Sequence, residues 1–316
     1  MEMHGDPTDL NNEGAPEPRW EWYRSFLHVA QAGSLSAAAR ALGLSQPTLG
    51  RHIDQLEATL GLRLFTRSPE GFAPTDAGQA LLPYAATLAT TAAALRRTAS
   101  GARGGPDGGL RGAVRISASE VMGVEVLPPI LAALQRMHPL LKLELVLSNQ
   151  ADDLLRREAD IAVRMFRPVQ QALLVRRVGA VELGLFAHAD YLDARGTPLS
   201  VAQLGGHALV GYGQESDFIR GLRRQLPDFA WDRFVFRADS DLAQLAAIRA
   251  GLGIGVCQAS LAARDARLMR LLPQQFAPRL DTWIAMHGDL RHSSGCQAVF
   301  DALADGLAQY LACQPG

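Results

Sequence analysis

The sequence is poor in lysine and cysteine, and its charges are almost balanced. Lys142 is the one lysine among 31 basic residues, and the formal net charge is −1. A uniformly basic coat is therefore excluded, and any nucleic-acid contact has to come from a local patch. The excess of arginine is compatible with phosphate recognition, because a guanidinium donates paired hydrogen bonds. It is equally compatible with a GC-rich coding bias, because the arginines are spread along the whole chain.

The sequence has few features that are typical of a metal site, a disulfide-bonded protein or a membrane protein. The three cysteines, Cys257, Cys296 and Cys313, are too far apart for a ligand cluster and odd in number, so we expect no disulfide framework, zinc site or cofactor. No apolar run approaches the length of a membrane span. Residues 1–19 are polar, which indicates a disordered tail rather than a signal peptide. We therefore expect a soluble, cytoplasmic protein without a membrane partner.

The sequence divides into consecutive segments that differ in their residue patterns. Hydrophobic residues make up 48% of the chain, which is enough to form buried cores. After the tail we expect a helical domain at 20–78, a long alanine- and leucine-rich helix at 76–103, a glycine-rich linker at 104–112, and alternating strands and helices at 113–316. The alternation in the last part is typical of an α/β sheet. The chain is therefore predicted to be an α/β multidomain protein.

The helical domain begins with three short helices. The first covers Trp20–Ala32. Ser34 is a suitable N-cap and Gly43 a suitable C-cap for the second helix at Leu35–Leu42, and Ser45 can cap a third helix that extends to Leu60. Two helices joined by a tight turn are typical of a helix-turn-helix, in which the second helix of the pair reads DNA.

The two faces of the third helix differ in character. At 100° per residue, its apolar residues fall within about 40° of one another. They are Leu49, Ile53, Leu56 and Leu60. The opposite face carries Pro47, Arg51, Asp54 and Ala58, flanked by Thr48 and Gln55. Such a small, polar face suits insertion into a major groove, although a merely solvated face would look similar.

Two further segments complete this part. Residues 63–67 alternate like a strand, residues 68–71 form a turn, and residues 72–75 form a second strand, so we expect a wing in which Arg67 contacts a phosphate. The long helix then repeats small apolar residues at alternating spacings of four and three. They are Leu81, Ala85, Leu88, Ala92, Leu95 and Ala99. This stripe could pack against its own domain, but we favour dimerisation, through Leu81, Leu88 and Leu95.

Several motifs together resemble the winged helix-turn-helix of the LysR-type transcriptional regulators. They are Ser34–Leu42, Ser45–Leu49, Leu56-Glu57, Leu60-Gly61, Leu64-Phe65, Arg67 and Thr75–Gly78. Looser motifs at Asp160–Arg164 and Ala250–Gly255 are similar to the effector region of that family. The resemblance implies a homodimer or homotetramer that binds promoter DNA and a small-molecule effector, with RNA polymerase as a further candidate partner.

The resemblance also implies which residues contact DNA. Base and phosphate contacts would fall on Gln46, Pro47, Thr48, Arg51 and Arg67, and we add Ser45 and Gln55 from the same region. The chain departs from the family at Gly50, where a serine is usual. Glycine weakens a helix by about 1 kcal/mol relative to alanine, and we predict that the preferred DNA sequence differs at the base that this serine would contact.

The α/β part contains candidate residues for an effector site. A strand at Val114–Ser117 ends in a turn with Ser117, Ser119 and Glu120, where free N–H groups at a helix N-terminus can bind an anion. The serines could instead only cap that helix. Arg164 ends a strand beside Phe166 and could clamp an anionic effector, or form a salt bridge with Glu120 or an aspartate.

We expect two subdomains, one at about 113–181 and 284–316 and the other at about 182–283, as in a periplasmic-binding-protein-like fold. The cleft between them is the expected pocket. Its second wall would contain Gly211-Tyr212-Gly213, Asp239-Ser240 and the turn near Gly255–Gln258.

Two other functions are disfavoured. No nucleophile elbow, P-loop, complete dinucleotide fingerprint or paired histidine motif is present, so we do not expect an enzyme. A solute-binding transport protein would share the two-lobed sheet, but it would carry a signal peptide and no helix-turn-helix.

Overall fold

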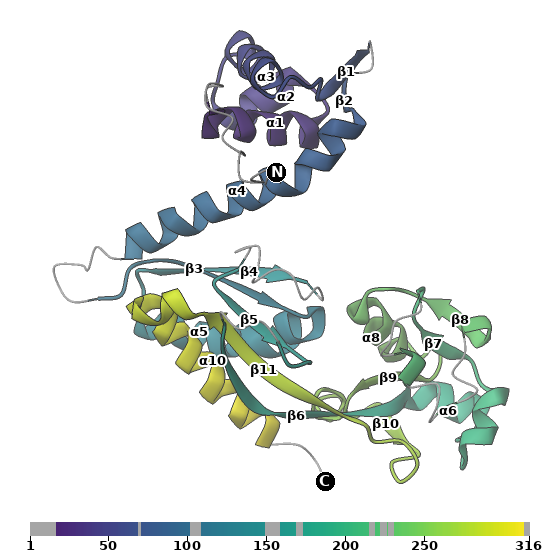
Figure 1. Cartoon of the computed structure of the whole chain (residues 1–316). Helices are drawn as coiled ribbons and strands as arrows, with labels where there is room; N and C mark the ends of the chain where they lie inside the picture. The colour runs from purple at the N-terminus through teal and green to yellow at the C-terminus, as the bar shows by residue number, and fades with distance from the viewer. Residues whose placement is uncertain are drawn as a thin grey trace, which may run out of the picture. The chain divides into compact units, whose positions relative to one another are not determined.

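The structure, a computed structural model, describes residues 17–68, 71–101, 109–148, 159–168, 173–214, 219–221, 226 and 231–312 (Figure 1). The chain divides into two units, with the boundary between Ala93 and Ala94. Most of the expected tail at 1–19 and most of the linker at 104–112 lie outside the described residues.

The first unit begins with three helices whose caps match the sequence expectations. They are α1 (Trp20–Ala32), α2 (Leu35–Leu42) and α3 (Gln46–Leu60). The hydroxyl of Ser34 accepts a hydrogen bond from the N–H of Ala37, and the hydroxyl of Ser45 accepts one from the N–H of Thr48. Gly43 adopts a left-handed conformation (φ 66°) after α2, where glycine carries no Cβ penalty. These caps fix the ends of the second and third helices.

A wing and a long helix follow. Strands β1 (Phe65–Ser68) and β2 (Gly71–Pro74) pair antiparallel, with Arg67 opposite Phe72. Helix α4 (Asp76–Gly101) begins where Thr75 accepts a hydrogen bond from the N–H of Gly78. The buried core joins the helices to the wing and to the first part of α4. It contains Phe26, Leu27, Val29, Ala38, Ala39, Leu49, Ile53, Leu56, Leu64, Phe65 and Ala85.

The second unit contains a mixed sheet in the strand order β10-β6-β11-β5-β3-β4, with β9 also paired to β6. Strands β4 and β5 run parallel to β3, and β11 runs antiparallel to both β5 and β6. The strands are β3 (Gly112–Ala118), β4 (Leu141–Leu147), β5 (Ile161–Arg164), β6 (Leu173–His188), β9 (Gly255–Gln258), β10 (Leu268–Leu271) and β11 (Arg279–His287). The strand expected at Val114–Ser117 and the strand expected to end at Arg164 are therefore confirmed.

One end of this sheet forms the first lobe. Helices α5 (Leu127–Met137) and α10 (Ser294–Ala312) contribute Leu127, Leu134, Val299 and Phe300 to its buried core. A Cβ added at Gly306 would lie 2.7 Å from Ile130, so a glycine lets α10 approach α5 closely. A single π-helical stretch, η1 (Met122–Val126), links β3 to α5, and the short helix η4 (Gly288–His292) precedes α10.

The other end of the sheet forms the second lobe. Here the last part of β6 pairs with β9 and β10, and a separate parallel pair joins β7 (Leu209–Gly211) to β8 (Phe234–Arg237). The helices are α6 (Ala189–Arg195), η2 (Val201–Gly206), η3 (Trp231–Arg233), α8 (Asp241–Arg249) and α9 (Ala259–Ala262). Two buried clusters form its core, one around Leu204 and Phe276 and one around Leu245 and Ile248.

The lobes are joined by two long strands that lie side by side, β6 and β11 (Figure 1). Their pairing runs from His287 opposite Leu173 to Arg279 opposite Glu182, with an irregularity between Thr282 and Trp283. The chain thus crosses from the first lobe to the second within β6 and returns within β11.

Candidate functional site

The outward face of α3 is polar and accessible. Leu49, Ile53 and Leu56 are buried in the core, as the helical angles predict. The side opposite them is solvent-exposed. Its exposed residues are Ser45, Gln46, Pro47, Arg51, Asp54, Gln55 and Ala58, while Thr48 and Gly50 are half-buried. The predicted DNA contacts of this helix therefore share one accessible surface.

The N-terminus of α3 is held by its own side chains. The hydroxyls of Ser45 and Thr48 are hydrogen-bonded at 2.7 Å, and Ser45 also caps the helix. Apart from its chain neighbours and the adjoining backbone of α3, no heavy atom of the described residues lies within 4 Å of a Cβ added at Gly50, so the surroundings leave room for a serine. Gln46 and Arg51 project from a helix start whose position is thus fixed by the cap.

A buried glutamate that the sequence analysis did not select fixes the other end of α3. The Glu57 carboxylate is 6% exposed and accepts hydrogen bonds from the N–H groups of Leu64 (2.8 Å) and Phe65 (3.2 Å) and from Arg63 (2.7 Å). Burial raises the pKa of Glu57, but the hydrogen bonds from Arg63, Leu64 and Phe65 outweigh it and hold the pKa below its usual value. The carboxylate thereby ties α3 to the start of the wing.

The wing is also tied to the turn between α1 and α2. The N–H of Phe72 donates a hydrogen bond of 2.8 Å to the carbonyl of Gly33. A Cβ at Gly71 would lie 2.4 Å from that same carbonyl oxygen, so the close approach requires glycine. The backbone of Arg67 lies in β1, and the structure does not describe its side chain.

The apolar stripe of α4 has two different environments. Leu81 packs against the core of the first unit and Ala85 is fully buried in it. Leu88 and Leu95 are 44% and 63% exposed. The first part of the stripe, with Leu81 and Ala85, therefore packs within its own domain. Leu88 and Leu95 are exposed and remain available for self-association.

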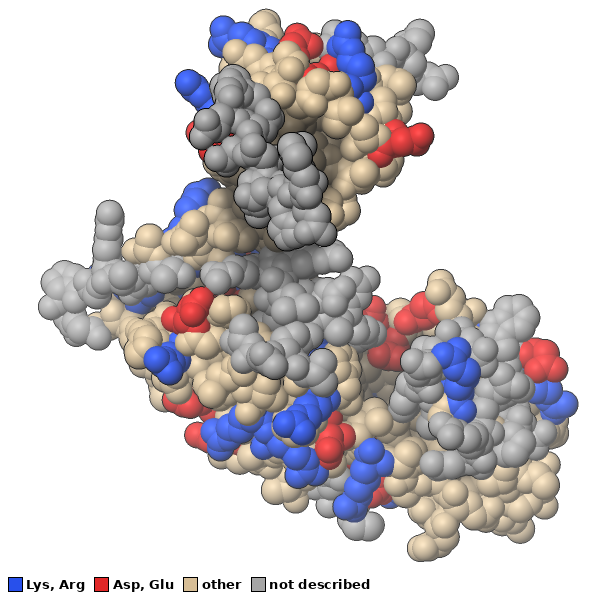
Figure 2. Space-filling model, in the orientation of Figure 1, with Lys and Arg blue, Asp and Glu red and all other residues tan. Residues whose placement is uncertain are grey.

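On the face shown in Figure 2, basic and acidic side chains form small separate patches. This distribution agrees with the near-zero net charge. Any DNA contact on this face would therefore depend on local groups rather than on a broad positive field.

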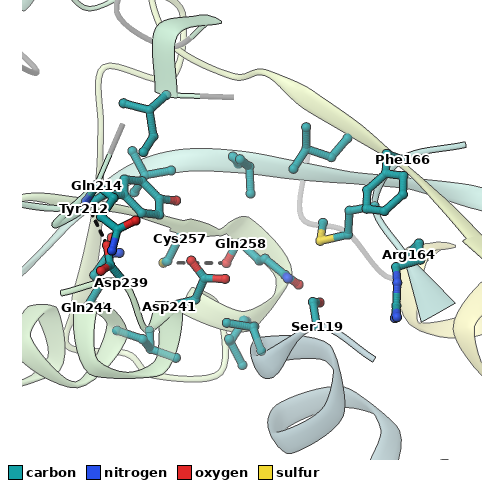
Figure 3. Close-up of a pocket in the computed structure, with 18 residues that line it drawn as sticks. Ser119, Arg164, Phe166, Tyr212, Gln214, Asp239, Asp241, Gln244, Cys257 and Gln258 are labelled. Atoms are coloured by element: carbon teal, nitrogen blue, oxygen red, sulfur yellow. Dashed lines mark hydrogen bonds between the residues drawn. The ribbon is translucent and has the colours of Figure 1, made fainter. Parts of the chain in front are cut away.

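A cavity of about 520 Å³ lies between the two lobes of the second unit (Figure 3). This volume is within the range of small-molecule sites. Its lining is mostly apolar, with contributions from β5, β6, β9, β11 and α8. The lining residues are Ser119, Val121, Arg164, Met165, Phe166, Leu183, Tyr212, Gln214, Ile219, Asp239, Asp241, Gln244, Leu245, Val256, Cys257, Gln258, Leu261 and Leu280.

Four of the predicted effector-binding residues line this cavity: Ser119, Arg164, Phe166 and Tyr212. Arg164 is 3% exposed, and its guanidinium donates to the hydroxyl of Ser117 at 2.8 Å and to the carbonyl of Val163 at 3.0 Å. The hydroxyl oxygen of Ser119 is buried and has no hydrogen-bond partner among the described residues. Ser119 therefore does not use its hydroxyl to cap the following helix.

The other four predicted residues lie outside the lining. Ser117 is buried beneath the cavity, where it accepts the hydrogen bond from Arg164. Glu120 accepts a hydrogen bond of 2.7 Å from Ser240, which links the two lobes directly. Gly255 is packed so closely that an added Cβ would lie 2.6 Å from Ile248.

The cavity also contains other polar residues: the sequence analysis placed Asp239 and Gln258 in the second wall, and it missed Gln214, Asp241 and Gln244. Asp239 and Asp241 flank Ser240, which caps α8, and Gln258 accepts a hydrogen bond from Tyr310 at 3.0 Å. Burial, with a smaller contribution from the charge of Asp241, raises the pKa of the Tyr212 phenol, which stays protonated. Burial also raises the pKa of the Cys257 thiol to about 12.

Neither a metal site nor a membrane span is found in the part of the chain that the structure describes. Within it, no three His, Cys, Asp or Glu side chains gather in an arrangement that could hold a metal ion. No described helix is both long and apolar enough to cross a bilayer.

The geometry defines a class: a winged helix-turn-helix followed by a long helix and a two-lobed α/β unit. Two family models match these same parts. "Bacterial regulatory helix-turn-helix protein, lysR family" matches residues 20–79, and "LysR substrate binding domain" matches residues 107–308. The chain therefore belongs to the LysR family.

Individual relatives agree with this membership. A helix-turn-helix-type transcriptional regulator of Xanthomonas campestris is 30% identical over 182 residues, which is 58% of this chain and 52% of the relative. The regulator PgrR of Escherichia coli is 26% identical over 59% of this chain and 61% of its own length. The matched region thus spans little more than half the length of these relatives.

Solved structures show the same fold over most of the chain. CbnR, a LysR family transcriptional regulator, has a TM-score of 0.67 at 21% identity, with 91% of this chain and 99% of that chain covered. CrgA from Neisseria meningitidis has a TM-score of 0.55 at 22% identity, with 92% and 99% covered.

Proposed function

We propose that this chain is a DNA-binding transcriptional regulator that controls promoters in response to a small molecule bound between its lobes. The observation that carries the proposal is the outward face of α3, where Gln46, Arg51 and Gln55 are exposed opposite buried Leu49 and Ile53. A helix of this kind can present its polar side chains to base edges in a major groove. Family membership and the regulators among its relatives support the same role.

We assign base contacts to the start of α3 and phosphate contacts to the wing. Gln46, Arg51 and Gln55 are exposed side chains long enough to reach base edges, whereas Ser45 and Thr48 hold the helix start. Arg67, in the wing, is assigned to a phosphate. Because the whole chain is nearly neutral, one such face would bind weakly. Pairing two faces in a dimer through Leu88 and Leu95 would make the second binding event intramolecular and so raise the overall affinity well above that of either face.

We assign effector binding to the cavity of the second unit. Ser119 and Arg164 offer hydrogen-bond donors, and Phe166 and Tyr212 offer apolar surface. The cavity fits regulation by population shift, because a ligand that contacts both lobes favours the arrangement in which both contacts are made. Such a regulator would act on RNA polymerase at promoters in the cytoplasm, and no catalytic role is proposed.

The test begins with selection of bound duplexes from a random-sequence pool by the full-length chain. Affinity for the selected sequence is then measured with Arg51→Ala and with Arg24→Ala, an exposed arginine on α1 as the matched control. We expect Arg51→Ala to weaken binding by about 1–3 kcal/mol and the control to leave it unchanged. If both variants lost the same amount of DNA affinity, or if neither lost any, the proposal that this face of α3 reads the DNA sequence would be wrong.

A further inference from the structure

Arg97, near the end of α4, forms a buried ion pair with Asp160. The guanidinium donates two hydrogen bonds to the carboxylate, from Nε at 2.9 Å and from Nη2 at 3.0 Å, and the two side chains are 11% and 5% exposed. A paired contact of this kind fixes orientation as well as distance. Because residues 94–316 form the second unit, the ion pair lies within that unit and docks the last turns of α4 on it.

Asp160 is also bound to the neighbouring strand β3. Its carboxylate accepts a hydrogen bond of 2.8 Å from the N–H of Arg115, and its own N–H donates one of 2.8 Å to the carbonyl of Arg115. Asp160 directly precedes β5, which runs parallel to β3. One carboxylate therefore joins the end of α4 to two adjacent strands.

The same two strands end at the cavity. Arg164 is the last residue of β5 and Ser119 directly follows β3, and both side chains line the cavity. A second side-chain contact bridges the strands at this end, because Arg164 donates to the hydroxyl of Ser117 at 2.8 Å. Asp160 and Arg164 are four residues apart in extended chain, a span of about 13 Å. The strand pair is thus bridged at α4 by Asp160 and at the cavity by Arg164.

The segment between the two bridges is tightly packed. All four residues of β5 are buried, and Ile161 and Val163 belong to the core of the first lobe. A close-packed interior has little free volume, so the displacement of one end of a packed strand is transmitted rather than absorbed. β5 therefore forms a stiff connection between Arg164 and Asp160.

We propose that Arg97 and Asp160 are positioning residues that couple the cavity to α4: a ligand that moves Arg164 moves β5, and the ion pair carries this movement to the end of the helix. The inference rests on the proposed function of the cavity and adds how its occupancy reaches the helix that carries Leu95. At 100° per residue, Leu95 lies about 160° from Arg97 around the helix. Leu95 is 63% exposed. The ion pair thus sets which face of these turns is offered for self-association.

The first measurement tests the docking on the full-length chain, with neither DNA nor ligand present. Hydrogen exchange with mass spectrometry is followed in peptides that cover 94–101. We expect Arg97→Gln and Asp160→Asn each to raise the exchange rate there by about tenfold or more, the effect of losing one hydrogen bond to a charged group. Arg97→Lys keeps the charge but not the paired geometry, so its rate should fall between those of the native chain and Arg97→Gln. Arg96→Gln, which alters an exposed arginine one position earlier, should leave the rate unchanged. No increase with Arg97→Gln would overturn the proposal.

The second measurement tests the coupling. Arg164→Gln removes the bridge to Ser117 at the cavity end and should raise the exchange rate at 94–101 by about twofold to thirtyfold, the range of coupling between connected sites. In an Arg97→Gln background the same substitution should have no further effect, because the connection is already broken. Ile248→Val, which removes packing from a core of the second lobe, controls for general destabilisation and should leave the rate at 94–101 unchanged. The melting temperature of each variant verifies folding.

The outcomes separate this inference from the proposed function. If Arg97→Gln raises the exchange rate at 94–101 but Arg164→Gln does not, or if the two effects add independently, the ion pair only holds the helix and the coupling is wrong. That result leaves DNA reading by α3 and ligand binding in the cavity as they stand, since neither DNA nor ligand takes part. If the coupling is observed while Arg51→Ala leaves DNA affinity unchanged, the proposed reading role fails and the connection within the second unit remains.

Discussion

Glu57 offers the sharpest structural prediction, because its carboxylate satisfies buried backbone donors. In Glu57→Ala the N–H groups of Leu64 and Phe65, both in buried residues, lose their acceptor. A buried donor without a partner costs about 1–3 kcal/mol, so the two together cost about 2–6 kcal/mol. Because the bond to Phe65 is the longer one, at 3.2 Å, we take the lower part of the range, about 2–4 kcal/mol.

Native-state hydrogen exchange with mass spectrometry measures this loss locally, in peptides that cover 46–68. Glu57→Gln is the matched control, because its amide oxygen can still accept from the backbone N–H groups while its charge is removed. We expect Glu57→Ala to lose more protection than Glu57→Gln in α3 and β1. A loss below about 0.5 kcal/mol for Glu57→Ala, the level of an ordinary surface substitution, would refute the anchoring role.

The pH dependence of the free energy of unfolding tests the role of the Glu57 carboxylate independently. Hydrogen bonds hold the folded-state pKa of Glu57 below its usual value despite burial, so the ionised form stabilises the fold above the unfolded-state pKa of about 4.3. That stability is lost as the pH falls through the lower folded-state pKa. The stability difference between the native chain and Glu57→Gln should therefore be constant near neutral pH and shrink below about pH 4.3. A difference that grows on acidification would contradict this sign.

Four further predictions concern other parts of the chain. Gly50→Ser, for which the surroundings leave room, should change the base preferred at one position of each half-site; identical preferences in a random-sequence selection would contradict this. Leu88→Glu combined with Leu95→Glu should reduce the mass measured by light scattering, whereas a Leu199→Glu control should not; an unchanged mass would place the dimer interface elsewhere. Arg164→Ala should abolish the effector response and keep DNA affinity, so a normal response in reporter assays would exclude the clamp. The Cys257 thiol, with its pKa raised to about 12 by burial, should be alkylated much more slowly than a peptide thiol near neutral pH; mass spectrometry showing equal rates would disprove its burial.

Local interactions made the helices and the exposed face of α3 predictable. The caps at Ser34, Ser45 and Gly43 act within a few residues, so their sequence positions define helix ends directly. The angular separation of Leu49 from Arg51 depends on helix geometry alone, and the structure places these two residues on the buried and exposed faces as expected. Family motifs of the winged helix follow the same short-range spacing.

Contacts between distant segments were not predictable in this way. Glu57 is charged and lies in a helix, so sequence alone favours an exposed position, and its burial depends on how residues 64 and 65 fold back. Glu120 and Ser240 are 120 residues apart and pair with each other, although each was expected to face the ligand. Asp241 begins α8 without any motif, and the packing of the two lobes brings it into the cavity that Arg164 also lines.

The central claim is that the outward face of α3 reads DNA sequence, and position-resolved specificity tests it most directly. Preferred sequences are determined for the native chain and for Arg51→Ala by selection from the same random duplex pool, with Arg24→Ala as control. We predict that Arg51→Ala loses preference at one base position in each half-site and keeps the others. An unchanged preference at every position, or binding lost equally in the Arg24→Ala control, would contradict the claim.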